Sequence, residues 1–367
     1  MADAPLEGRQ AERPEGTAPL AAAPGSPILA RLTDKLPEGT GLWQRADLAT
    51  PMALRVAATL RLADHIAGGL ATATELAGAL NVNADALDRL IRHLAGVGVL
   101  VRDDAGRCEL TDRGRELLDG HPSHLRAELD VEGGLGRADL AFIHLLHSVR
   151  TGEAAYPRMF GGGFWDDLAS DPARTSSYDR QMGFDVAAWA ARILAAYDWA
   201  SLGHVVDVGG GDGTLLALML REHPKLRGTV FDQPLTAAAA RGNLAAGGLA
   251  DRCDVVAGDF FDPLPRGAGG YVLCAVLHDW NDGAARSILQ RCAKAAAPKG
   301  KVFVIEKTGA GGEAVSTEMD LRLLVYFGGK QRGVAELTEL ATSSGLSVAS
   351  VHPAGDISIL ELVVPAV

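Results

Sequence analysis

A histidine and an acidic residue occupy positions from which they could act together on a proton. His278 follows an apolar run over residues 272–277, and Glu306 lies near the end of another, over residues 301–307. A neutral imidazole accepts a proton near neutral pH, and a carboxylate bound to its second N–H orients the ring and stabilises the imidazolium. A lone histidine is more often structural, so the pair predicts a general base only if the chain binds a reactant beside it.

A glycine-rich segment offers a place for such a reactant. Residues 205–214 read VVDVGGGDGT, an apolar run followed by Gly209, Gly211 and Gly213. Glycines let a chain turn sharply and approach a ligand with no Cβ atom in the way, which makes Gly209 and Gly211 candidate ligand contacts. The third glycine comes one residue too early for the dinucleotide fingerprint, and no basic residue in the turn meets a phosphate. The segment therefore predicts a nucleoside-type ligand held without a phosphate clamp.

Acidic residues also follow the next two apolar runs. Asp232 comes 25 residues after Asp207, and Asp259 is followed by Phe260. A carboxylate at the first position can accept hydrogen bonds from both ribose hydroxyls. An acid beside an aromatic ring suits the amino edge and the face of an adenine. S-adenosylmethionine fits this series best, and we expect no metal ion.

The elements that must position these residues are short strands alternating with helices. From residue 204 onward the apolar runs are HVVDVG, GTVFD, CDVVAGDF, GYVLCAVLH and KVFVIEK, separated by helical stretches such as TLLALMLREH. The alternation predicts an α/β catalytic domain over residues 201–367, a Rossmann-like doubly wound sheet that binds ligands at the carboxyl ends of its strands. His278 is expected to end the fourth strand. The segments LSVASVH and DISILELVV are expected to form a final hairpin.

Residues 41–120 predict a winged-helix domain, all-helical apart from one hairpin. Thr72 and Glu75 form a T-x-x-E capping box, Asn83 can cap the next helix, and GVLVRDDAGRCELT alternates as a hairpin does. The third helix reads NADALDRLIRHLA, in which two aspartates offset two arginines. Because a DNA-reading helix needs basic side chains to meet phosphates, this helix favours dimerisation over DNA binding.

An apolar stripe near the start of this domain supports a homodimer. Met52, Val56, Leu60 and Ala63 recur at i, i+4, i+8 and i+11, which predicts one face of an amphipathic helix. Together with the apolar third helix, this stripe exceeds what one small domain needs for its own core.

A helical connector is expected over residues 121–200, rich in aromatic and sulfur-containing side chains. An apolar slot lined by such side chains suits a flat aromatic ring. The alternative is that most of them belong to the core. The residues predicted to line a substrate pocket are Trp165, Tyr178, Met182, Asp279, Met319 and Tyr326.

Composition disfavours several classes of protein. Of 367 residues, 35 are basic and 46 acidic, and the net charge of −11 argues against nucleic-acid binding. No run approaches the roughly 18 uncharged apolar residues of a membrane span, and the N-terminus lacks a signal pattern. The 4 cysteines form no C-x-x-C pair, which favours a reducing, cytoplasmic compartment.

Residues 1–40 contain 6 of the 17 prolines, which predicts a flexible tail.

The motifs DVGGGDG, FDQP, GDFFDPLP, LHDWND and GGKQR occur in this order. With them, residues 40–367 resemble the S-adenosylmethionine-dependent small-molecule O-methyltransferases, both the plant caffeate-type enzymes and the actinobacterial aromatic-polyketide enzymes. The resemblance implies a class I methyltransferase fold and methylation of a phenolic hydroxyl on an aromatic secondary metabolite, such as an antibiotic precursor. It also implies that the N-terminal domain dimerises the enzyme and helps to close the partner's active site.

The resemblance also assigns roles to individual residues. It implies that His278 is the base and Glu306 the orienting acid, and that Trp280 packs near the adenine. The remaining cofactor contacts that it implies are Gly209, Asp232, Asp259, Phe260 and Cys274.

One position departs from the family pattern, and some alternatives stay open. Plant members have a second acid, within GGKER, where this chain has Gln331, whose neutral amide can orient the histidine ring but cannot stabilise its charge. The chief rival is an enzyme of the same fold that binds the cofactor but hydroxylates, decarboxylates or rearranges its substrate; His278 with Glu306 favours methylation. A winged-helix regulator is the second rival. The sequence does not indicate the substrate, the hydroxyl, the pathway, or whether the nucleophile is N or C instead of O.

Overall fold

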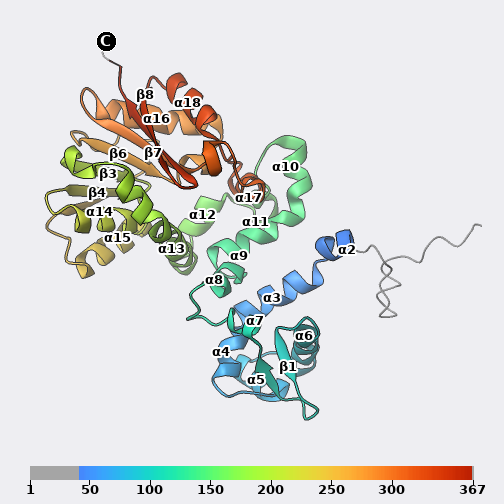
Figure 1. Cartoon of the computed structure of the whole chain (residues 1–367). Helices are drawn as coiled ribbons and strands as arrows, with labels where there is room; N and C mark the ends of the chain where they lie inside the picture. The colour runs from blue at the N-terminus through green and yellow to red at the C-terminus, as the bar shows by residue number, and fades with distance from the viewer. Residues whose placement is uncertain (1–40, 366–367) are drawn as a thin grey trace, which may run out of the picture. The chain divides into compact units, whose positions relative to one another are not determined.

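The computed structural model describes residues 41–365 (Figure 1). The tail expected over residues 1–40 lies outside the described residues. The chain forms two compact units. The first contains α2 (Gly41–Ala46) and the start of α3 (Ala49–Thr59), up to Met52, and the second begins at Ala53.

The second unit begins with the helices and hairpin of the predicted winged-helix domain. After α3 these are α4 (Leu62–Ala67), α5 (Ala73–Leu80), α6 (Ala84–Gly96), β1 (Leu100–Arg102), β2 (Cys108–Leu110) and α7 (Asp112–Arg115). The capping box is confirmed: the Thr72 hydroxyl accepts from the Glu75 N–H, and the Glu75 carboxylate accepts from the Thr72 N–H. Asn83 caps α6, and β1 pairs antiparallel with β2, as predicted.

The predicted apolar stripe does not lie on one helix. α3 ends at Thr59, and Arg61 adopts a left-handed conformation, with φ of 50°, before α4 begins. The predicted spacing of apolar residues continues across this turn, but the turn changes the direction of the chain. Ala63 therefore does not share a helical face with Met52 and Val56. The buried face of α3 is made of Ala53, Ala57 and Ala58. Met52 and Val56 are 37% and 38% exposed, so the core of the described chain does not need them.

The connector is helical, as predicted. Its elements are α8 (Leu125–Leu129), α9 (Gly134–Asp139), η1 (Leu140–His144), α10 (Leu145–Thr151), α11 (Tyr156–Phe160), α12 (Phe164–Ala169), α13 (Pro172–Ala196) and η2 (Trp199–Leu202). The start of α13 is favoured by Pro172 at its first position and by Asp171, whose carboxylate accepts from two backbone N–H groups of the first turn. α13 runs without interruption for 25 residues and leads into the sheet.

The second half of the chain forms a seven-stranded sheet in the order β5-β4-β3-β6-β7-β9-β8. β3 to β7 are parallel, β9 is antiparallel to β7, and β8 with β9 is the predicted final hairpin. The strands are β3 (His204–Val208), β4 (Arg227–Asp232), β5 (Cys253–Ala257), β6 (Gly270–Cys274), β7 (Lys301–Lys307), β8 (Ser347–Ala354) and β9 (Ile357–Val363). The predicted doubly wound α/β fold is confirmed.

Helices cover both faces of this sheet. They are α14 (Thr214–Glu222), α15 (Pro234–Ala246), α16 (Asp282–Ala296) and α18 (Val334–Ser343). α13, α14 and α15 share a core with one face, through side chains such as Ile193 and Met219. α16 and α18 share a core with the other face, through side chains such as Ile288 and Leu337. The remaining elements are η3 (Leu277–Asp279), η4 (Ala310–Gly312) and α17 (Thr317–Phe327).

The position predicted for His278 at the end of the fourth strand is wrong. β6 ends at Cys274, and His278 lies in the η3 turn beyond it. Between them Ala275 adopts φ of 54°, a strained conformation for a residue with a Cβ atom. The apolar run continues past the strand because Val276 and Leu277 are buried in the turn rather than in the sheet.

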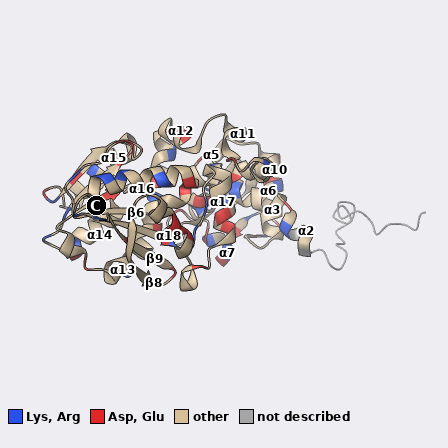
Figure 2. Ribbon diagram, turned by 90° about the horizontal axis from the view of Figure 1, so that it is seen from above, with Lys and Arg blue, Asp and Glu red and all other residues tan. Residues whose placement is uncertain are grey.

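Figure 2 shows acidic and basic residues interspersed over helices and loops. No helix within residues 41–365 is long and apolar enough to cross a membrane. In the same range no group of three or more His, Cys, Asp or Glu side chains is arranged to hold a metal ion.

Candidate active site

A cavity of about 800 Å³ lies where β3, β4 and β6 end. Parallel strands bring the loops at their carboxyl ends to one edge, which is where ligands bind in such sheets. All the predicted site residues except Glu306 and Asp259 line this cavity. Those that line it are Gly209, Gly211, Asp232, Phe260, Cys274, His278, Trp280, Trp165, Tyr178, Met182, Asp279, Met319 and Tyr326.

His278 lies between two carboxylates. Its Nδ1–H donates to Oε2 of Glu306 over 2.7 Å, and its Nε2 lies 3.4 Å from Oδ1 of Asp279. The other oxygen of Glu306 accepts from the backbone N–H groups of Leu277 and His278, over 3.0 and 3.3 Å. Glu306 is therefore buried behind the histidine with both oxygens bonded, while His278 and Asp279 line the cavity.

Burial and charge have opposite effects on the pKa of His278. Burial by itself lowers this pKa, but the charges of Glu306 and Asp279 raise it, and the net result is a pKa of about 9. Burial raises the pKa of the Asp279 carboxyl to about 7. A phenol has a pKa of about 10, so the raised pKa of this imidazole lowers the free-energy cost of taking up a phenolic proton.

The GGKQR motif holds the turn that carries His278. Arg332 is buried, and its Nη1 and Nη2 donate to the carbonyls of Leu277 and Trp280 over 2.9 and 2.8 Å. Gly329 packs directly on the same turn, because a Cβ atom there would lie 2.2 Å from the carbonyl oxygen of His278. The motif therefore fixes the backbone from which the imidazole projects.

Gln331 is buried in the cavity wall and positions α17. Its side-chain Oε1 accepts from the Ser316 N–H over 2.8 Å, and its backbone N–H donates to Oδ1 of Asp320, also over 2.8 Å. Ser316 caps the N-terminus of α17, the helix that carries Met319 and Tyr326. The oxygen of this amide is thus engaged with the start of α17 and not with the histidine ring.

The glycine turn and Asp232 form a cradle in the cavity wall. Gly209 and Gly211 have φ of 70° and 60°, which favours glycine at both positions. A Cβ atom at Gly209 would lie 2.9 Å from a Val276 methyl group, whereas one at Gly211 would meet nothing within 4 Å. The Asp232 carboxylate accepts from the N–H groups of Gly211 and Gln233, over 2.9 and 2.7 Å, and burial raises its pKa to about 6.

Aromatic rings continue this cradle. Phe260 and Phe261 pack edge-on against Trp280, with ring centroids 5.6 and 4.9 Å apart from it. Cys274, at the end of β6, is buried in the same wall. Asp259 is exposed outside the cavity wall, where its carboxylate accepts from the Phe261 N–H over 2.8 Å. The cradle thus has polar groups suited to a ribose and an apolar slot suited to a purine, which fits an adenosine.

A second aromatic wall of the cavity is built around Trp165. Trp165 stacks on Phe327 and Trp280, with centroids 5.2 and 6.3 Å away, and meets Tyr178 edge-on at 5.7 Å. The indole N–H of Trp165 is buried with no hydrogen-bond partner among the described residues. Such a donor remains available to a polar group on a bound aromatic molecule.

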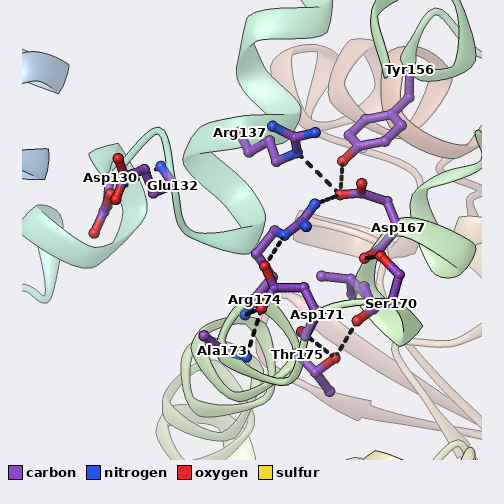
Figure 3. A network of polar contacts seen from close by, with 11 residues as sticks. Asp130, Glu132, Arg137, Tyr156, Asp167, Ser170, Asp171, Ala173, Arg174 and Thr175 are labelled. Carbon is purple, nitrogen blue, oxygen red and sulfur yellow. Dashed lines mark hydrogen bonds and ion pairs between the residues drawn. The ribbon is translucent and has the colours of Figure 1, made fainter. Parts of the chain in front are cut away.

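A polar network fixes the two helices that carry this wall (Figure 3). The carboxylate of Asp167, on α12, accepts from the Tyr156 hydroxyl over 2.7 Å and from the Arg137 guanidinium over 3.1 Å. It also accepts from Arg174, on α13, which bonds Asp171 as well. α9, α11, α12 and α13 therefore meet at one carboxylate, which lies two residues after Trp165 in the sequence.

Sequence reasoning missed several charged residues of the cavity. Asp139 accepts from Arg55, Arg322 and the Tyr326 hydroxyl, and all four line the cavity. Asp179, on α13, was missed as well. The partners of Asp139 are distant along the chain, and no motif marks them. Asp179 could have been suspected from the sequence, because it is an acidic residue within a helical stretch rich in aromatic side chains.

Two family models match the chain. The model of the O-methyltransferase dimerisation domain matches residues 43–120, and that of the O-methyltransferase domain matches residues 142–347.

Curated relatives extend over most of the chain. The 2,7-dihydroxy-5-methyl-1-naphthoate 7-O-methyltransferase of Streptomyces carzinostaticus is 54% identical over 322 residues, covering 88% of this chain and 97% of the relative. Aclacinomycin 10-hydroxylase RdmB of Streptomyces purpurascens is 43% identical over 327 residues, covering 86% and 87%. A solved O-methyltransferase from neocarzinostatin biosynthesis, in complex with S-adenosylmethionine and 2-hydroxy-5-methyl naphthoic acid, superposes with a TM-score of 0.85 at 52% identity, covering 90% of this chain and all of that one.

Proposed function

Because the chain belongs to the O-methyltransferase family, we propose that it transfers the methyl group of S-adenosylmethionine to a phenolic hydroxyl of an aromatic secondary metabolite. The observation that carries this proposal is the imidazole of His278, which lies in the cavity wall with its Nδ1–H bonded to a buried carboxylate. The glycine cradle in the same cavity supports S-adenosylmethionine as the donor.

The cofactor is held by the residues at the ends of β3 to β6. Gly209 and Gly211 let it approach the backbone, and Asp232 binds its ribose hydroxyls. Phe260, Cys274 and Trp280 surround the adenine, and Asp259 reaches its amino edge from the rim. The bound cofactor supplies an electrophilic methyl group.

His278 removes the phenolic proton as the methyl group moves. Nε2 accepts the proton, because the Nδ1–H is committed to Glu306. Glu306 fixes the ring and stabilises the positive charge that forms on it. The arrangement needs no metal ion, and the base acts only in its neutral form.

The substrate is a flat, hydroxylated polycyclic ring system of polyketide type. Trp165, Tyr178 and Met182 supply an apolar wall from the connector, and Met319 and Tyr326 supply another from α17. Asp279 lies beside the imidazole, where it binds the reacting hydroxyl. The naphthoate on which the 54% identical relative acts is a compound of this class.

Hydroxylation is the second candidate activity, because the 43% identical relative is a hydroxylase. The bonded pair of His278 and Glu306 favours methylation, since hydroxylation has less need of a base at this position. Mass spectrometry of products distinguishes the two: methylation adds one CH₂ unit to the substrate, and hydroxylation adds one oxygen atom.

The enzyme is proposed to act as a homodimer in the cytoplasm. Residues 41–120 serve dimerisation, residues 121–200 build the substrate walls, and residues 201–367 bind the cofactor. Exposure of Val56 and the match to a dimerisation domain support the dimer. Light scattering tests it, since Val56→Glu should weaken association. Four buried free cysteines support a reducing compartment, and the net charge of −11 disfavours a nucleic-acid partner.

Calorimetry with S-adenosylhomocysteine is the first test of the whole proposal. We expect saturable binding with one site per chain. Incubation with S-adenosylmethionine and a panel of hydroxynaphthoates and related phenols should then give a methylated product. Absence of S-adenosylhomocysteine binding at high micromolar concentration would contradict the proposal.

A further inference from the structure

The cavity wall contains a buried cation whose hydrogen-bond donors are not all used. Arg55, on α3, lines the cavity, and its side chain is only 15% exposed. One terminal nitrogen, Nη2, donates to Oδ2 of Asp139, but the other, Nη1, is buried with no hydrogen-bond partner among the described residues. A buried donor without an acceptor is unfavourable, so a bound molecule is expected to complete this guanidinium.

The acidic residues around Arg55 balance its positive charge only in part. Asp139 accepts from the guanidinium groups of both Arg55 and Arg322, so one negative charge is shared between two cations. Arg322 has a second acid, because its Nη2 donates to Glu318 over 3.1 Å. Arg55 forms no second ion pair among the described residues. An anion from outside is therefore favoured at Arg55 rather than at Arg322.

Arg55 lies beside the wall that α17 contributes to the cavity. Asp139, which binds Arg55 through Oδ2, accepts from the Tyr326 hydroxyl through Oδ1. Met319, Arg322 and Tyr326 follow one another at intervals of three and four residues, so they share one face of α17, and all three line the cavity. The guanidinium of Arg55 is therefore one carboxylate away from a side chain proposed to hold the aromatic ring.

We propose that Arg55 binds a carboxylate on the aromatic substrate, so that the substrate is a hydroxylated aromatic acid. A carboxylate supplies both the acceptor and the negative charge that Arg55 lacks, and its two oxygens suit the planar donor fork of a guanidinium. A neutral hydroxyl or carbonyl group would supply the acceptor without the charge. The inference rests on the proposed function, because it takes the aromatic substrate from it, and it adds a specificity-determining residue on α3.

The test compares matched ligands by calorimetry on the full-length protein saturated with S-adenosylhomocysteine. Each member of a panel of hydroxynaphthoic acids is paired with the naphthol that has the same hydroxyl and lacks the carboxylate. We expect at least one acid to bind the wild type about 10-fold or more tightly than its naphthol, as a charge-assisted hydrogen bond should provide. Arg55→Met should weaken binding of that acid by about 10- to 100-fold and leave the affinity for the naphthol within about twofold.

Arg322→Met is the matched control. It removes a guanidinium from the same carboxylate, that of Asp139, but one whose two terminal nitrogens already have acceptors. It should therefore change the affinities for the acid and the naphthol by the same factor. Arg55→Lys keeps the charge without the planar fork, and it should restore part of the affinity for the acid.

Specific outcomes would overturn the inference. They are a wild type that binds every acid no more tightly than its naphthol, or an Arg55→Met variant that loses affinity equally for both ligands, which would indicate a structural role of the pair with Asp139. A wild type that does not bind S-adenosylhomocysteine would instead overturn the proposed cofactor. Because that binding is measured before the aromatic ligands are added, the two failures are distinguishable.

Discussion

At the scale of single residues, the proposed reaction depends on the proton affinity of His278. We predict that His278→Ala lowers kcat by about 10²–10⁴-fold, the range typical of a lost general base. Raising the pH should restore part of the activity, because the phenolate then forms in solution. Affinity for S-adenosylhomocysteine should barely change, since the cradle lies on other residues. Steady-state kinetics and calorimetry measure these quantities.

A near-normal kcat of the alanine variant at neutral pH would contradict this assignment. In that case proximity and orientation of the reactants would account for the transfer without a base. The family membership of the chain would be unaffected.

The pH profile gives a second prediction at this scale. The imidazole must be neutral to accept a proton, and its pKa is raised to about 9, so kcat/KM for the aromatic substrate should rise with pH up to that region. Glu306→Gln removes one of the charges that raise this pKa, so the rising limb should move to lower pH. Its kcat should fall less than that of His278→Ala, because the proton acceptor remains. A limb that stays near pH 9 in this variant would show that Glu306 does not control the base.

At the scale of elements, the proposed substrate wall depends on how α12 and α13 are joined. Asp167 connects them through Arg174 and also binds Tyr156 (Figure 3). Asp167→Asn removes the charge that these donors share, and we predict a loss of about 2 kcal/mol in the free energy of unfolding. KM for the aromatic substrate should rise, because Trp165 loses its fixed position. Chemical denaturation and steady-state kinetics measure the two effects.

The matched control is Asp166→Asn, which neutralises an exposed acid next to it on α12. It should change neither the stability nor KM. If Asp167→Asn lowered affinity for S-adenosylhomocysteine as strongly as for the aromatic substrate, the network would not belong to the substrate wall alone.

At the scale of the whole molecule, buried acids make stability depend on pH. Burial raises the pKa of Asp179, Asp207 and Asp279 from 3.8 to about 7 and that of Asp232 to about 6. Between the unfolded-state pKa of 3.8 and these raised values, the folded state binds more protons than the unfolded state. The free energy of unfolding therefore falls as the pH rises through this range. The raised pKa of His278 acts in the same direction between pH 6.5 and about 9.

We therefore predict that the Tm of the ligand-free protein falls steadily from mildly acidic pH to pH 9. Calorimetric scans of the wild type and of Asp179→Asn measure this slope, which should be smaller in the variant because one of the raised groups is gone. A Tm that rises over this range would contradict the burial of these acids. The protein concentration must be the same throughout, because association in the proposed homodimer would contribute to Tm.

The architecture and the place of most candidate site residues follow from local sequence. Strand and helix periods are properties of neighbouring residues, and the parallel alternation then places every strand-end residue at one edge. For this reason Gly209, Asp232 and Glu306 could be predicted to lie near one ligand. The capping box at Thr72 and Glu75 is local in the same way.

Only the tertiary structure decided how these residues are held and what surrounds them. The left-handed Ala275 and the turn that carries His278 depend on contacts with Gly329 and Arg332, more than 50 residues away. Asp139 meets Arg55 and Tyr326 across 84 and 187 residues of chain. Such contacts form because packing closes long loops, and no periodicity within one segment records them.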